Sequence, residues 1–384
     1  MSRMPRMDRL TVVLALPLLA ALLLPMLSFR PNRIAEHQGR TLVELFGPFW
    51  AGVIVAMTLL LSVVLLLERR PWLRGLLLAP VLVGLFLLLG HAASGLLSEA
   101  PPAARASPGP GFWLAFGALV LLMVDTVSRA HATTGAKTLL LIGTVAAIAI
   151  LLRSGVLADL SIAAEYRGRA SAFHGALIDH LTLAFGSFLA ALVAGVPAGM
   201  LIQRRPALRD AVMNLLTMIQ TIPSIALFGM LILPLAWIAA NLPGAAGVGI
   251  RGIGMAPALI ALFLYSLLPI VANTVAGLDG VPPAVTEAAT GMGMTRAERR
   301  RLVDIPLALP VILTGARIVL VQNIGLATVG ALIGSGGFGT FVFQGIGQTA
   351  TDLILLGVLP TVALALLTSA IMDLMIALFR VQSP

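Results

Sequence analysis

The 384-residue sequence is 59% hydrophobic and 11% charged, and its mean hydropathy is +1.02. This composition excludes an ordinary soluble domain and predicts a polytopic helical membrane protein. The lack of cysteine excludes disulfides, thiolate metal sites and cysteine nucleophiles. The net charge of +9 is spread over short loops, which argues against nucleic-acid binding and is typical of membrane topology.

Ten apolar runs are long enough, or nearly long enough, to cross a bilayer, so we expect an all-α fold with about ten transmembrane helices. The runs lie at 10–29, 45–67, 75–97, 111–127, 138–152, 176–202, 211–240, 256–278, 311–333 and 353–379. With both termini in the cytoplasm, the inner loops hold 16 Lys and Arg residues and the outer loops hold 8. This bias agrees with the positive-inside rule.

The first apolar run could also be part of a signal peptide, because three arginines precede it. It is about 20 residues long and no A-x-A cleavage site follows, which favours a retained helix. The chain divides near residue 175. Residues 1–175 are predicted to be a membrane region of about five helices with an external polar connector at 153–175, and residues 176–384 hold every informative motif.

Two prolines, Pro223 and Pro269, interrupt predicted spans. A proline in a span frees a backbone carbonyl, which is tolerated only where protein or a water-filled cavity satisfies it. Each proline could simply be a structural kink. The polar side chains near them favour a candidate translocation path, formed by Gln220, Thr221, Pro223, Ser224, Pro269, Asn273 and Thr274.

The segment 279–306 is a basic insert between two apolar spans. It carries Arg296, Arg299, Arg300 and Arg301. Burying four arginines at the bilayer centre would cost on the order of 12 kcal/mol, so the segment lies outside the hydrocarbon.

Its pattern predicts two short helices joined by a turn. Pro282 and Pro283 suit a helix start, and Gly293 suits a helix end in the left-handed conformation. Thr295 and Glu298 have the spacing of a capping box, and Pro306 and Pro310 are expected to end the second helix. On these grounds alone, a solvated hairpin without a partner is an equal alternative.

Other classes of function have less support. The single lysine, Lys137, follows alanine, so the chain has no Gly-Lys-Ser/Thr phosphate-binding loop. The glycine-rich stretch 334–347 lies beside a span on the predicted outer side, where we expect irregular backbone or close helix approach.

An ion-coupled secondary transporter usually places ionisable residues at mid-membrane. Asp125, Asp279 and Asp373 lie near span ends and are expected to be anchors or packing partners. The histidines form no metal-binding spacing, and no catalytic residue, metal or cofactor is predicted.

The 279–306 segment resembles the EAA loop of bacterial ABC importer permeases, whose pattern is E-A-A, three residues, G, nine residues, I-x-L-P. The chain has Glu287-Ala288-Ala289, then Gly293, then Val-Asp-Ile-Pro at 303–306, with the spacing unbroken. The resemblance implies that this loop docks on a separate ATP-hydrolysing subunit. The residues implied for coupling are Glu287, Ala288, Ala289, Gly293 and Pro306.

Further stretches resemble the osmoprotectant branch of these permeases, which imports glycine betaine and choline. They are QTIPS at 220–224, ALFLYSLLPIV at 261–271, NTVAG at 273–277, EAATGMGM at 287–294 and GALIGSGGFG at 330–339. The additional N-terminal spans resemble the long permeases of Yeh-type systems. The alternatives are an importer for another small solute and, with less support from the residues, an ion-coupled secondary transporter.

The resemblance implies a type I ABC importer permease core in the bacterial inner membrane. The implied partners are ABC ATPase subunits, an extracytoplasmic substrate-binding protein and a second permease chain, identical or homologous. Of the six tryptophans and tyrosines, only Trp237 and Tyr265 lie in this core. Because recognition of a quaternary ammonium normally uses several aromatic rings, we expect selectivity to reside in the binding protein.

Overall fold

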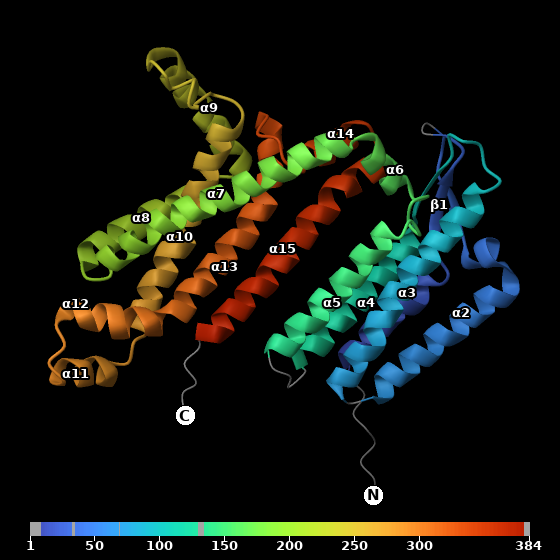
Figure 1. Ribbon diagram of the computed structural model, residues 1–384, viewed down its shortest axis with the longest axis horizontal. Coiled ribbons are helices and arrows are strands. Elements are labelled where there is room, and N and C mark those ends of the chain that lie inside the picture. Colours follow the sequence, from blue (N-terminus) through green and yellow to red (C-terminus); the bar gives the residue numbers. More distant parts are fainter. Residues whose placement is uncertain (1–8, 33–34, 69, 130–133, 380–384) are drawn as a thin grey trace, which may run out of the picture. The chain divides into compact units, whose positions relative to one another are not determined.

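The computed structural model describes residues 9–32, 35–68, 70–129 and 134–379. The chain forms two compact units, Met1–Gly168 and Arg169–Pro384, and each is described by itself (Figure 1). They are called the N-terminal unit and the C-terminal unit below.

The N-terminal unit consists of apolar helices and a small antiparallel sheet. Its elements are α1 (Arg9–Ala21), β1 (Leu27–Arg30), β2 (Gln38–Arg40), α2 (Leu42–Leu67), α3 (Pro71–Leu97), β3 (Arg105–Pro108), α4 (Pro110–Arg129), α5 (Thr134–Arg153) and α6 (Ser161–Gly168). The strand order is β2-β1-β3, and Leu27 lies opposite both Arg40 and Pro108.

The sheet was not predicted, and the prediction of one span over 10–29 is wrong. Helix α1 ends at Ala21, and the chain continues into β1. The reason lies in backbone pairing around Pro25, which has no N–H to continue a helix. The Met26 N–H donates to the Arg40 carbonyl at 2.9 Å, and the Gly111 N–H donates to the Pro25 carbonyl at 2.9 Å.

The core of the N-terminal unit is packed by leucine and phenylalanine. Phe112 is 1% exposed, and its ring lies edge-on to Phe86 at 5.5 Å between centroids. Leu27 and Leu78 are also fully buried. Helix α3 approaches the turn after α5 closely, since a Cβ at Gly90 would lie 2.5 Å from the Val156 carbonyl oxygen.

All the regular elements of the C-terminal unit among its described residues are helices or helical turns. Its elements are α7 (Ala170–Ile202), α8 (Pro206–Thr221), α9 (Ser224–Asn241), α10 (Met255–Asp279), α11 (Pro283–Gly291), α12 (Arg296–Arg299), the π-helix η1 (Arg300–Asp304), α13 (Ile305–Gly330), the 3-10 turn η2 (Ala331–Ile333), α14 (Gly339–Gly347) and α15 (Thr351–Phe379).

Helix α10 packs between α7 and α13, and α13 packs on α15 (Figure 1). Small residues permit this close packing, as is usual between helices in membranes. A Cβ at Gly199 of α7 would lie 2.7 Å from the Cβ of Thr274, and a Cβ at Gly315 of α13 would lie 2.6 Å from that of Asn273. Glycines therefore set the separation of the three helices.

A buried polar network joins the same three helices. Asn323 of α13 is fully buried, and its Nδ2 donates at 2.9 Å to the hydroxyls of both Ser187 on α7 and Ser266 on α10. Because an unpaired amide in an apolar interior is costly, this network favours one relative position of the helices.

The glycine-rich stretch has irregular backbone and close helix contacts, as predicted. Three of its glycines have a positive φ, which glycine adopts without strain. The angles are +77° at Gly334 and +79° at both Gly336 and Gly337. His180 of α7 is fully buried beside this turn, and its ring centroid lies 5.0 Å from that of Phe338.

Among the described residues, eight helices are long and apolar enough to cross a membrane. About ten were predicted. The runs at 10–29 and 138–152 are not among the eight, since α1 has 13 residues and the apolar stretch found in α5 covers 142–153. The prediction of one continuous span over 211–240 is also wrong, because α8 ends at Thr221 and α9 begins at Ser224. Pro223 between them cannot donate a helical hydrogen bond.

Candidate functional site

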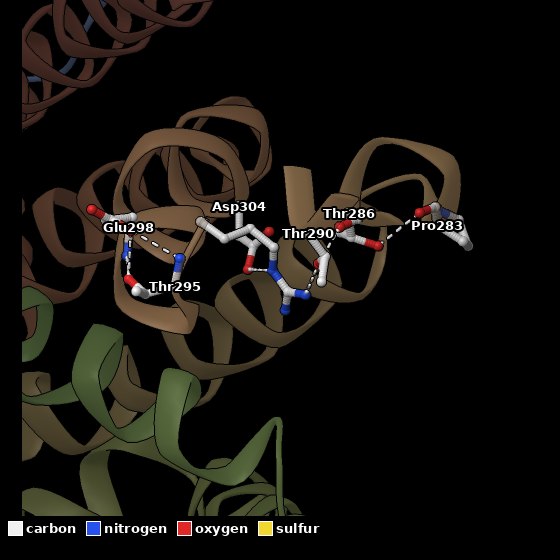
Figure 2. A network of polar contacts seen from close by, with 7 residues as sticks. Pro283, Thr286, Thr290, Thr295, Glu298 and Asp304 are labelled. Atoms are coloured by element: carbon white, nitrogen blue, oxygen red, sulfur yellow. Dashed lines mark hydrogen bonds and ion pairs between the residues drawn. The ribbon is translucent and has the colours of Figure 1, made fainter. Parts of the chain in front are cut away.

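The predicted basic insert forms a helical hairpin, residues 283–305, at one end of the C-terminal unit (Figures 1 and 2). Its first helix, α11, begins at Pro283 and ends in a glycine turn. Gly293 has φ +85°, and the Met294 N–H donates to the Ala289 carbonyl at 3.2 Å. This is the bond that closes a helix with a left-handed residue, so the predicted stop at Gly293 is confirmed.

The second helix of the hairpin starts with the predicted capping box, shown in Figure 2. The Thr295 N–H donates to a carboxylate oxygen of Glu298 at 2.8 Å, and the Glu298 N–H donates to the Thr295 hydroxyl at 3.3 Å. Two N–H groups that the helix itself cannot satisfy are thereby paired.

Arg299 connects the two helices of the hairpin. Its Nε lies 3.4 Å from Oδ2 of Asp304, and its Nη1 donates to the Thr290 hydroxyl of α11 at 3.5 Å. Both contacts are long, but they share one guanidinium and hold α11 against the start of the following helix. The hairpin is thus a built element with internal contacts of its own.

The second helix does not end at Pro306, as the sequence predicted, but continues through it into α13. The π-helix at Arg300–Asp304 precedes the proline, and the Ile305 N–H donates to the Arg300 carbonyl five residues back. A proline ring clashes with the carbonyl four residues before it in a regular helix. The wider π-turn shifts the hydrogen-bond register at that point, so the helix passes the proline without a break.

Four of the five residues predicted for coupling lie at the surface of the hairpin, namely Glu287, Ala288, Gly293 and Pro306. Ala289 is 2% exposed, so its methyl group packs inside the hairpin. Large apolar side chains are also exposed here, with Met292 at 72% and Leu302 at 62%. These side chains add apolar area to the exposed surface of the hairpin.

The two proline-interrupted spans are tied together by reciprocal hydrogen bonds. Pro269 has no N–H, so the carbonyl of Tyr265, four residues earlier, lacks its helical donor. Nε2 of Gln220 donates to that carbonyl at 2.9 Å. In return, the Tyr265 hydroxyl donates to the carbonyl of Ile222, beside Pro223. The protein itself therefore satisfies the backbone groups that the two breaks leave free.

Sequence reasoning missed this role of Tyr265. The available signal was its position four residues before Pro269, which identifies its carbonyl as the freed group. We call the contact between Gln220 and Tyr265 the proline clasp.

The remaining predicted path residues have different environments. Thr221 is exposed and Ser224 is partly exposed. Asn273 is partly buried, and its Nδ2 donates to the Pro269 carbonyl at 2.8 Å. Thr274 is fully buried against Gly199, which places it in the contact between α7 and α10 and not on an open surface.

Each aspartate that was expected to be an anchor or packing partner contacts an arginine. Nη1 of Arg209 donates to Asp279 at 2.8 Å, and the pair stands at the ends of α8 and α10. Asp125 and Arg129 pair one turn apart on α4 at 2.7 Å. Asp373 of α15 pairs with Arg317, which lies at the middle of α13. Both members of this last pair keep about two-fifths of their side chains exposed, at 40% and 44%.

Comparison with known protein families identifies the class to which the fold and hairpin belong. Residues 191–381 match the family described as binding-protein-dependent transport system inner membrane component. Residues 8–163 match a second family, the N-terminal domain of the ABC transporter permease YehY. The chain belongs to the permease family of binding-protein-dependent ABC importers, in the form that carries the YehY-type N-terminal domain.

Curated relatives match about half of the chain. The osmoprotectant import permease protein OsmW of Salmonella typhimurium is 43% identical over 188 residues, which cover 49% of this chain and 82% of OsmW. The choline transport system permease protein OpuBB of Bacillus subtilis is 35% identical, with 49% of this chain and 79% of OpuBB covered. A solved structure of the inward-facing MetNI methionine ABC transporter is similar at 24% identity and a TM-score of 0.48, covering 54% of this chain and 96% of that one.

Membership in this family defines the general role of the chain. It is a multi-pass inner-membrane transport subunit, and ATP hydrolysis belongs to a separate subunit. Proteins of the family work with an ATPase and with a substrate-binding protein.

Proposed function

We propose that this chain forms the translocation path of an importer for osmoprotectants such as glycine betaine or choline. The proposal is supported by its relatives, since OsmW, OpuBB and the Listeria carnitine permease OpuCD carry names from this substrate group. The matched region includes both the proline clasp and the hairpin. The N-terminal region up to about residue 175 has no assigned part in this path.

The hairpin is the proposed docking element for the ATPase, and it is the observation on which the mechanism rests. Glu287, Ala288 and Gly293 would contact the ATPase directly, because they are exposed. Ala289 is buried and Pro306 lies where the hairpin enters α13. Both would act by maintaining the shape and position of the hairpin. With the hairpin docked on the ATPase, the proposal has both chain termini in the cytoplasm, which agrees with the excess of Lys and Arg in the loops on that side.

The candidate path runs beside the proline breaks. Non-helical backbone at membrane depth is tolerated only where it is buried in protein or lines a water-filled cavity. Thr221 and Pro223 are exposed at the break between α8 and α9, which favours a surface in contact with water over one in contact with lipid. Gln220, Ser224, Pro269 and Asn273 complete this candidate path. Thr274 supports it from the buried contact with α7.

In the proposed cycle, ATP binding closes two ATPase subunits, which push on the hairpins of two permease chains. A second permease chain, identical or homologous, is needed because the five-span core forms only one side of a path. The helices then shift as rigid bodies from an inward-facing to an outward-facing arrangement. The binding protein delivers the solute, and hydrolysis resets the complex.

The test is transport by the whole complex in proteoliposomes, with the chain co-expressed with its ATPase, companion permease and binding protein. A panel of binding-protein ligands should include glycine betaine, choline and methionine. The proposal predicts that the first two, but not methionine, stimulate ATP hydrolysis and enter the vesicles. Stimulation by methionine alone would leave an importer but reject the osmoprotectant assignment.

A further inference from the structure

The cytoplasmic end of α7 is joined by side chains to three other parts of the C-terminal unit. From the hairpin, Nη2 of Arg300 donates to the Met200 carbonyl at 2.8 Å. From α7 itself, Gln203 donates to Asp279 of α10 at 3.0 Å, and the same carboxylate accepts from Arg209 of α8 at 2.8 Å. This end of α7 is therefore a junction between the hairpin, α8 and α10.

The Arg300 contact satisfies a carbonyl that the helix itself leaves free. Helix α7 ends at Ile202, so carbonyls in its last turn have no N–H group following them in the helix. These carbonyls also carry the negative end of the helix dipole, which attracts a guanidinium. The bond lies in a partly buried site, where it is less exposed to competition from water than a surface contact.

Arg300 also provides a connection that the chain does not. The hairpin continues covalently into α10 on one side and into α13 on the other, but α7 is about 80 residues earlier in the sequence. At the junction, the Met200 side chain packs with Ala308 and Ile312 at the start of α13. Apolar packing of this kind is non-directional. The Arg300 hydrogen bond is directional, so it fixes the end of α7 to the hairpin.

Arg300 and its neighbour Arg299 contact different elements. Arg299, immediately before it, reaches back to Thr290 within the hairpin, whereas Arg300 reaches across to α7. Adjacent arginines thus serve two different connections, one inside the hairpin and one out of it.

We propose that Arg300 is a positioning residue that transmits movement of the hairpin to α7. This inference rests on the proposed function, because it assumes that an ATPase moves the hairpin. Helix α7 is packed on α10 through Gly195 and Gly199, where α7 itself contributes no side chain and Ile270 and Thr274 of α10 contact it closely. A displacement that Arg300 passes to α7 would therefore also reach α10, the helix that carries Tyr265 of the proline clasp. This route is additional to the direct covalent connection between the hairpin and α10.

The test compares Arg300→Gln and Arg300→Lys with the matched control Arg205→Gln in the full reconstituted complex. Arg205 is an exposed arginine close to the same end of α7, outside the hairpin, so its replacement removes an equal charge. Loss of a hydrogen bond from a charged group changes an equilibrium by roughly tenfold or more. We expect the solute transported per ATP hydrolysed to fall roughly tenfold in Arg300→Gln. Arg300→Lys should recover part of the ratio, and Arg205→Gln should equal wild type.

A wild-type ratio in Arg300→Gln would overturn the inference. Failure of the wild-type chain to associate with any ATPase would instead overturn the proposed function, so the two failures are distinguishable.

A spectroscopic measurement covers the case in which Arg300→Gln does not assemble. The sequence has no cysteine, so spin labels can be placed only where intended, at Met292→Cys on the hairpin and Leu201→Cys on α7. Both positions are exposed, at 72% and 53%. The inference predicts a distance between the labels that stays constant when the wild-type complex binds ATP. A distance that changes with ATP would contradict a rigid link.

Discussion

The N-terminal and C-terminal units are both built from apolar helices, but they differ in where the backbone leaves regular helix. In the N-terminal unit, irregular segments lie mostly between helices, where a small sheet pairs part of their backbone. Within a helix, α2 is kinked near its start at Gly47, which has φ +74°. In the C-terminal unit, irregular backbone lies within or directly beside the candidate spans, at the α8–α9 break, the π-helix and the glycine-rich turn. A helix that is interrupted within a membrane leaves backbone groups that need polar partners. At the α8–α9 break and at Pro269, the side chains of Gln220 and Tyr265 are those partners.

The same contrast extends to the way the helices are fixed to one another. Leucine and phenylalanine fill the N-terminal core, as Phe112 and its neighbouring rings show. In the N-terminal unit a directional bond joins Arg74 of α3 to the Thr11 hydroxyl of α1. In the C-terminal unit the Asn323 network joins three helices and the proline clasp joins α8 to α10. Apolar contacts stabilise without specifying direction, whereas hydrogen bonds define particular arrangements. We therefore expect substitutions that break these bonds in the C-terminal unit to reduce transport. Substitutions that lower the stability of the N-terminal unit by the same amount should leave transport unchanged.

The largest effect is expected for Gly293→Asp in the hairpin. The change adds a charge and a side chain at an exposed residue with φ +85°. We expect membrane insertion to be intact, whereas ATPase association and transport are abolished. Co-purification of the ATPase and solute uptake measure these outcomes. Gly291→Asp is the matched comparison, because its backbone is helical and a Cβ there meets open space, and it should retain more association. Normal transport by Gly293→Asp would defeat the docking assignment.

Tyr265→Phe should have the next largest effect, because it removes the hydroxyl that satisfies the Ile222 carbonyl. Leaving a partly buried acceptor unpaired costs up to about 3 kcal/mol. We expect a lower unfolding temperature in detergent and a several-fold loss of transport. Thr217→Val on α8 is the comparison, because it removes an exposed hydroxyl that donates within its own helix, to the Met213 carbonyl. Equal behaviour of the two variants would show that the bond from Tyr265 to Ile222 has no special part in transport.

Gly199→Ala tests the close contact between α7 and α10. The added methyl carbon would lie 2.7 Å from the Thr274 Cβ, so the helices must separate or tilt. Overpacking of this kind costs about 1–3 kcal/mol, and we expect reduced thermal stability together with reduced solute per ATP. Gly186→Ala on the same helix is the control, since its nearest neighbour lies at an ordinary 3.5 Å. Identical stability of both variants would show that α7 and α10 are not fixed by this contact.

The smallest effect on coupling is expected for Gly90→Ala in the N-terminal unit. A methyl carbon 2.5 Å from the Val156 carbonyl oxygen should destabilise that unit, while Gly84→Ala on the same helix meets open space. Thermal unfolding should distinguish the two variants, but the solute transported per ATP should be equal. A lower ratio in Gly90→Ala would show that the N-terminal unit takes part in the transport cycle.

Much of the hairpin was predictable, because its signals are local. Proline, glycine and a Thr-x-x-Glu spacing act on the backbone within one turn, and the structure has the expected helix start, glycine stop and capping box. The continuation through Pro306 was not predictable, since it depends on a π-turn that compensates for the proline. Periodicity and composition carry no signal for such a turn.

Contacts between distant residues escaped the sequence for a different reason. The resemblance to a permease core indicated which helices matter, but not that Gln220 satisfies the carbonyl freed by Pro269 or that Arg300 reaches α7. The sheet was missed because β1 continues directly from an apolar run, and only pairing with β2 and β3 distinguishes it from helix. Local patterns fix local backbone, whereas long-range partners require the fold.

Cross-linking of the hairpin to the ATPase tests the central claim most directly. Single cysteines would be placed in the cysteine-free chain at Met292, on the hairpin, and at Val248, which is 78% exposed in the loop predicted to face outward. The account predicts that Met292→Cys cross-links to the ATPase subunit in the assembled complex and that Val248→Cys does not. Absence of a cross-link from Met292→Cys in a complex that hydrolyses ATP, or a cross-link from Val248→Cys alone, would contradict it.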